Sequence, residues 1–301
     1  MVFAAAPIAP VTGQMATTPP WSPGRIWGRF GVDLAAAGCA TLLVSPVIAA
    51  VDRAIVENTA NVSTIRGSLQ SSLRMACRSP AAFVCHRAFV WTAGLYGATY
   101  ATANVIDTAC EWAATDARLY KFLGTTPVNM ALVLRKDMVF ARMFAAPVAP
   151  VPQIPQPVPV PPQPVAVPFP RSSLALFAVR DAHTVLASFL LPPVIGAWLH
   201  EHGAVATRAR GELLAQLAAP CVIQLVSTPY HILALDLFNR PSGNKSEKKT
   251  VLGADRWAII RQKYAVTVAA RMGRILPAFG VGGVTNRHVR QTLAHTFKLD
   301  V

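Results

Sequence analysis

The sequence predicts an all-α integral membrane protein with six transmembrane helices, arranged as three pseudo-repeats of two helices each. Three observations lead to this fold class. The chain is 53% hydrophobic and only 14% charged, whereas soluble domains carry about 25% charged residues. Its apolar residues gather in long uncharged runs. Its 28 lysines and arginines are concentrated in alternate connections between those runs.

The uncharged runs supply the expected spans. A helix needs roughly 17–25 apolar residues to cross the hydrocarbon core. Four runs reach this length: 34–51, 88–106, 182–199 and 213–235. The shorter runs 123–134 and 275–286 complete six spans if their flanking charges face a polar interior. We expect Pro46, Pro127 and Pro229 to kink the odd-numbered spans, because each removes a backbone hydrogen bond.

The basic residues then orient the spans. They are frequent in the connections 52–87, 135–180 and 236–274 and sparse in 107–121 and 200–212. Such an asymmetry is typical of a multi-pass membrane protein. The net charge of +14 therefore indicates topology rather than a nucleic-acid surface, since no basic stretch is interleaved with stacking aromatic residues. We expect lipids as partners and no nucleic acid.

Two proline-rich segments, residues 1–30 and the insertion 147–170, are expected to be disordered. Proline has no backbone N–H and favours an extended polyproline II conformation. The insertion would serve as a spacer or as a docking segment for a protein partner. We assign residues 31–301 to the membrane domain, with repeats over about 31–106, 112–200 and 210–295.

Three repeats of two helices, with a Ser/Thr-Pro step in each odd span and a basic amphipathic loop inside each pair, resemble the mitochondrial carrier family. The stretch 273–280 (GRILPAFG) looks like the start of that family's last helix, and segment 256–268 is similar to its matrix-side surface helix. The resemblance implies solute transport by alternating access. It also implies a multi-pass protein of the mitochondrial inner membrane, or alternatively of the outer membrane.

The chain departs from the family's gate motif, P-x-[DE]-x-x-[KR]. None of the six gate charges stands at its expected place after Pro46, Pro127 and Pro229. Other charged residues lie near the ends of the odd spans: Asp52, Arg53, Lys136, Asp137, Asp236 and Arg240. They could form displaced ion pairs that gate the protein, or they could be ordinary helix-end charges in water.

Arg87, Arg180 and Arg274 recur near the starts of the even spans. In a threefold bundle, equivalent positions on the even helices converge on a central cavity, where the resemblance implies contact with the substrate. An ionisable residue inside a span is costly and so indicates a function. The alternative is that all three arginines lie at the interface and extend to lipid headgroups.

Two functions of different classes follow. The first is a carrier that holds a small anionic metabolite with the three arginines, whose guanidinium groups match a carboxylate or phosphate. The second is a transport-incompetent membrane adaptor or scaffold that docks partners through residues 147–170. The sequence shows no nucleophile elbow, phosphate loop, metal cluster or paired carboxylate. We therefore expect no enzymatic activity, no cofactor and no metal, and the substrate is not identified.

Overall fold

The computed structural model describes residues 23–144, 169–240 and 253–299. All the regular secondary structure in these ranges is helical, which confirms the all-α class. The disorder expected for residues 1–22 and for most of the insertion 147–170 lies outside the described residues. The elements are α1 (Pro23–Thr59), α2 (Ile65–Arg78), α3 (Pro80–Cys85), α4 (Arg87–Trp112), α5 (Ala117–Phe144), α6 (Arg171–Val185), η1 (Leu186–Leu190), α7 (Leu191–Glu201), α8 (Arg208–Asn239), α9 (Gly253–Gly273), η2 (Leu276–Val281) and α10 (Gly282–Thr296).

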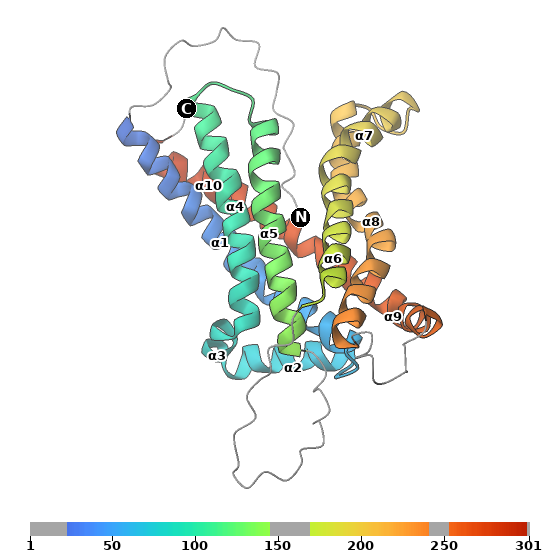
Figure 1. The fold of residues 1–301 in the computed structure, drawn as a ribbon. Helices are drawn as coiled ribbons and strands as arrows, with labels where there is room; N and C mark the ends of the chain where they lie inside the picture. The colour runs from blue at the N-terminus through green and yellow to red at the C-terminus, as the bar shows by residue number, and fades with distance from the viewer. Residues whose placement is uncertain (1–22, 145–168, 241–252, 300–301) are drawn as a thin grey trace.

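The long helices form two groups that share a diagonal rod (Figure 1). The first group contains α1, α4 and α5, and the second contains α6, α7 and α8. In the first group α4 packs extensively on α1 and on α5, and in the second α8 packs extensively on α6 and on α7, whereas α5 touches α6 and α8 at only a few places. The rod of α9, η2 and α10 runs behind both groups, with α9 packed on α8 and α10 packed on α1. The direct interface between the two groups is therefore narrow.

Each of the six expected spans lies within a helix or a helical rod of the structure. Among the described residues, three rods are long and apolar enough to cross a membrane: Gly24–Thr59, Arg171–Glu201 and Arg208–Asn239. The helices α4, α5 and α10 carry more polar side chains, such as the buried Thr92, Asn104 and Asn286. Whether these three also cross the membrane, to give six spans, stays a prediction.

The exposed face of α1 shows why the bundle suits a lipid environment. Leu34, Leu42 and Leu43 are all more than half exposed, and Leu42 reaches 63%. On the opposite face, the small residue Ala40 and the larger Ile48 are completely buried against neighbouring helices. A helix on the surface of a soluble protein shows charged residues outward instead. Close packing through small residues is common between helices in membranes.

Prolines lie inside the helices that contain the first, third and fifth predicted spans, as the sequence predicts. Pro46 lies within α1, Pro127 within α5 and Pro229 within α8. Inside a membrane bundle, neighbouring helices can satisfy the carbonyl groups that each proline frees. The N-terminal prediction needs correction, because α1 begins at Pro23 and residues 23–30 are helical rather than disordered. Proline is favoured in a first helical turn, whose N–H groups have no intrahelical partner.

The packing does not repeat three times. The first predicted repeat pairs α1 with α4, and these two helices pack extensively. The second pairs α5 with the α6–α7 rod, but α5 packs mainly on α4 and only slightly on α6. The three pseudo-repeats therefore stay a prediction from the sequence.

Candidate functional site

Charged side chains are buried in the bundle at two levels along α1. Asp33 is near its start and Asp52 near its end, with 0% and 5% of their surfaces exposed. At 1.5 Å per residue they are about 28 Å apart, close to the ~30 Å thickness of the hydrocarbon core. An apolar cluster that includes Val44, Leu95 and Ala278 fills the bundle between them. The separation of the two levels along α1 is thus close to the thickness of the hydrocarbon core.

The first level, which we call the Asp33 cluster, joins α1, α4 and α10. Arg290 Nε donates to Asp33 Oδ1 at 2.6 Å, and Thr108 Oγ1 donates to Asp33 Oδ2 at 2.6 Å. Glu111 accepts from Arg290 at 3.2 Å and from Arg29 at 2.6 Å. Sequence analysis missed this cluster, although Arg29 and Asp33 stand one helical turn apart at the start of an apolar run.

The second level, which we call the Asp52 network, begins between α1 and α5. Asp52 forms ion pairs with Lys136 of α5 and with Arg274, which lies between α9 and η2. Lys136 Nζ also lies 3.1 Å from Oδ1 of its neighbour Asp137. The network therefore connects α1 and α5 with the diagonal rod.

Arg180 extends the network into the second helix group. Its Nη1 lies 2.6 Å from Asp137 Oδ2, and its Nη2 lies 2.6 Å from Asp181 Oδ1. Arg180 Nη1 also lies 2.8 Å from Nδ1 of His231 on α8. A guanidinium group can only donate, so Nδ1 carries no proton and the imidazole is neutral. Arg180 thus links α6 with both α5 and α8.

Arg271 of α9 is the last member of the network. Its partners are uncharged side chains, whereas the other cations of the network each pair with a carboxylate. Arg271 is only 1% exposed. Its Nε donates to Gln224 Oε1 at 2.9 Å, and its Nη2 donates to Ser227 Oγ at 3.3 Å. Within the described ranges, no carboxylate lies within 4.0 Å of its guanidinium. Sequence analysis missed Arg271 because it falls in the basic connection 236–274 rather than in an uncharged run.

The structure brings two of the three predicted arginines together. Arg180 and Arg274 both belong to the Asp52 network, whereas Arg87 is exposed at the first position of α4. The reason is local, because His86 ends the preceding short helix and its Nδ1 accepts from Ala88 N at 3.2 Å to cap α4. Arg87 therefore begins a new helix at the end of the bundle, and the expected convergence of three arginines is wrong.

Three of the six predicted displaced gate charges belong to the Asp52 network, and the other three lie outside it. Asp52, Lys136 and Asp137 join different helices in the Asp52 network. Arg53 instead pairs within α1, with Glu57 at 2.7 Å.

Asp236 and Arg240 form a separate cluster at the end of α8. They are paired one helical turn apart at 2.6 Å. Arg256 of α9 lies 2.7 Å from the other oxygen of Asp236. This cluster fastens α9 to α8 and does not bridge the two helix groups.

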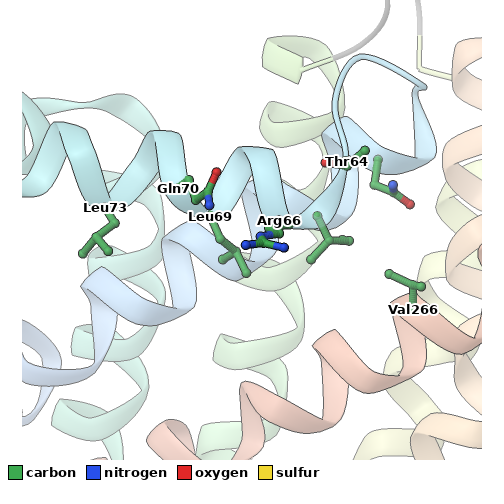
Figure 2. Close-up of a pocket in the computed structure, with 8 residues that line it drawn as sticks. Thr64, Arg66, Leu69, Gln70, Leu73 and Val266 are labelled. Atoms are coloured by element: carbon green, nitrogen blue, oxygen red, sulfur yellow. The ribbon is translucent and has the colours of Figure 1, made fainter.

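A surface groove lies beside the bundle rather than within the network. It has a volume of about 600 Å³ and runs between α2 and α9 (Figure 2). Leu69 and Leu73 of α2 and Val266 of α9 give it an apolar lining, with Arg66 beside them. No residue of the Asp52 network lines it. Its apolar character suits lipid contact better than a polar solute.

The apolar exterior and the rods long enough to cross a membrane define the class, an all-helical membrane protein. The chain belongs to the family described as probable citrulline exporter, whose profile matches residues 36–294. Membership of this family indicates a transporter of a small metabolite rather than an enzyme or a scaffold. No curated protein shows significant sequence similarity to the chain.

Family membership corrects the resemblance to mitochondrial carriers, which is wrong. That resemblance depended on Ser/Thr-Pro steps before Pro46, Pro127 and Pro229. Proline inside a transmembrane helix is tolerated wherever neighbouring helices satisfy the backbone, so such steps are not specific to one family. The absence of the carrier gate charges from the expected positions was the more informative observation. The mitochondrial location rested on the resemblance and has no support without it.

Proposed function

We propose that the protein exports citrulline, or a closely related neutral amino acid, by alternating access. The substrate comes from the description of its family. Citrulline carries an α-carboxylate, an α-ammonium group and an uncharged ureido group. It is therefore a zwitterion with no net charge, rather than the anionic metabolite expected from the arginines alone.

The observation that carries the proposal is the ion pair between Arg180 and Asp137. It crosses the narrow interface between the two helix groups, with side chains that are 2% and 8% exposed. A buried ion pair is costly to desolvate and is weak support for stability alone. When the groups separate at this level, both charges become available to water or to a solute.

The chemistry of the network favours a zwitterion. A ligand shifts a conformational equilibrium only by its different affinities for the two states. A solute that carries both a carboxylate and an ammonium group can compensate both kinds of charge that this separation leaves unpaired. A solute with only one kind of charge would leave one of the separated partners uncompensated.

Alternating access also needs contacts that can open and close at the opposite end of the bundle, and the Asp33 cluster supplies them. Alternating access requires that the bundle open at one end while it is closed at the other. The ion pairs of Asp33 with Arg290 and of Glu111 with Arg29 hold α1, α4 and α10 together at that end. We propose that these pairs and the Asp52 network open in turn.

Uptake of labelled citrulline by proteoliposomes tests the proposed function. We expect saturable uptake by the wild-type protein, and a loss of at least about tenfold in Asp137→Asn and Arg180→Gln. Arg208→Gln is the matched control, because Arg208 forms an exposed pair with Glu212 at 3.0 Å within α8. A folded wild-type protein that shows no saturable citrulline uptake would contradict the proposal. Uptake of another solute instead would correct the substrate and keep the transporter class.

A further inference from the structure

We infer that Arg271 binds the α-carboxylate of the transported solute and that Asp181 receives its α-ammonium group. The inference rests on the proposed function for the identity of the solute. The amino-acid end of the solute would then bind between α6, α8 and α9.

The charges of the Asp52 network do not balance. Its ionisable members comprise four basic and three acidic side chains: Lys136, Arg180, Arg271, Arg274, Asp52, Asp137 and Asp181. The neutral His231 adds no charge. Lys136, Arg180 and Arg274 each have a carboxylate partner. Arg271 is therefore the excess cation, and a buried charge without a counter-ion is unfavourable.

Arg271 is held by two uncharged side chains of α8. Gln224 Nε2 donates to Pro220 O at 2.8 Å, which directs Oε1 of the same amide toward Arg271 Nε. Ser227 Oγ accepts from Nη2. These two contacts use only part of the five N–H donors of a guanidinium group. The remaining donors form a fork that matches the two oxygens of a carboxylate.

Buried polar atoms without partners also lie on α8 and α9, the helices that carry Arg271 and the two side chains it contacts. Thr267 stands one turn before Arg271 on α9, and Thr228 follows Ser227 on α8. Both threonines are 0% exposed, and neither hydroxyl forms a hydrogen bond with any described residue. Most helical threonine hydroxyls can bond to the preceding turn. A buried hydroxyl without a partner calls for an explanation, and a bound solute would supply one.

Asp181 also has a buried polar atom without a partner, and its charge is opposite to that of Arg271. Its Oδ1 is bonded to Arg180, whereas its buried Oδ2 has no hydrogen-bond partner in the part of the chain described. In the part of the chain described, no nitrogen of the Arg271 guanidinium lies within 4.0 Å of an oxygen of Asp181, so the two side chains form no direct ion pair. A zwitterion that places its carboxylate on Arg271 and its ammonium group on Asp181 would give Arg271 a counter-ion and Asp181 Oδ2 a hydrogen-bond donor.

Ligand-induced thermal stabilisation of the purified full-length protein in detergent tests this assignment. The probes are citrulline, its decarboxylated analogue (4-aminobutyl)urea, and its deaminated analogue 5-ureidopentanoate. We expect citrulline to raise the Tm of the wild-type protein by several degrees, and each analogue to raise it much less. Arg271→Gln should abolish the shift with citrulline. Arg87→Gln, which changes an exposed arginine outside the network, should retain it.

The unliganded variants separate a binding role from a structural one. Removing an uncompensated buried charge should leave the Tm of Arg271→Gln equal to or above that of the wild type. A lower Tm would indicate instead that Arg271 mainly supports Gln224 and Ser227. Arg271→Lys keeps the charge without the planar fork. We expect it to bind citrulline with a midpoint raised about tenfold or more.

Three results would overturn the inference. They are unchanged citrulline binding in Arg271→Gln, equal stabilisation by the decarboxylated analogue, and the absence of amino-acid binding to the wild type. Uptake measurements keep this inference distinct from the proposed function. Citrulline binding without uptake would refute only the transport of citrulline. Normal citrulline uptake by Arg271→Gln would refute only the role of Arg271.

Discussion

Arg180 Nη1 lies 2.6 Å from Asp137 Oδ2, and this ion pair joins α6 to α5 across the narrow interface between the two helix groups. The same arginine contacts Asp181 and His231 within its own group. It is therefore the side chain through which a movement of one group relative to the other reaches the buried charges.

Removing one partner of this pair should destabilise the closed protein. We expect Asp137→Asn or Arg180→Gln to lower the free energy of unfolding by about 3–5 kcal/mol, because each leaves an uncompensated buried charge. The double variant should lose less than the sum of the two single losses. Thermal unfolding in detergent measures the effect. Arg208→Gln should change stability by less than about 1 kcal/mol, and single variants as stable as this control would contradict the account.

The contact between α7 and α8 depends on two glycines. A Cβ on Gly196 would lie 2.5 Å from Glu212 N, and a Cβ on Gly211 would lie 2.6 Å from Gly196 O. We expect Gly196→Ala and Gly211→Ala each to cost about 1–3 kcal/mol, since the two backbones must separate. Gly38→Ala is the control, because nothing lies within 4 Å of its added Cβ. It should be neutral or stabilising in the same unfolding measurement.

His86 should make the start of α4 sensitive to pH. Burial, followed by the nearby Arg53, lowers the pKa of His86 below its usual 6.5. Its Nδ1 must be unprotonated to accept from Ala88 N. The cap is therefore complete above the usual pKa and is lost as the pH falls through the lowered one. A cap contributes about 0.5–2 kcal/mol.

His86→Asn separates this effect from other titrations, because asparagine caps a helix without titrating. The Tm of the variant relative to the wild type should rise as the pH is lowered below about 6. A difference in Tm that stays constant over this range would show that protonation of His86 does not affect the cap.

The expected topology places the α4–α5 and α7–α8 connections on one side of the membrane and α2 on the other (Figure 1). Ala114, His202 and Ser71 are exposed positions in these three segments. With the native cysteines replaced, Ala114→Cys and His202→Cys should react with an impermeant thiol reagent from the same side. Ser71→Cys should react only from the opposite side. Labelling of Ala114→Cys and Ser71→Cys from one side would show that α4 does not cross.

Much of the fold could be predicted because membrane helices have a strong one-dimensional signal. Each of the six runs expected to span lies within a helix or a helical rod, and the prolines of α1, α5 and α8 lie inside their helices. The arrangement of these helices could not be predicted in this way. The unequal packing of α5 on α4 and α6 depends on side-chain contacts between segments distant in the sequence.

The candidate site was predictable only where a charge interrupts or borders an apolar run. Arg180 and Asp52 were identified for this reason, and both are buried in the network. Arg271 lies among other basic residues, so its burial depends on how α9 packs against α8. Arg87 shows the opposite case, because a helix cap rather than hydropathy decides that it is exposed.

The central claim is that the two helix groups separate at the Asp52 network when citrulline is transported. Spin labels at Arg87→Cys on α4 and Ser172→Cys on α6, both exposed, report the distance between the groups. We measure this distance by electron–electron double resonance in liposomes, with the native cysteines replaced. The account predicts two distance populations whose ratio changes with citrulline and does not change in Arg271→Gln. A single distance that citrulline leaves unaltered, in protein that still takes up citrulline, would contradict it.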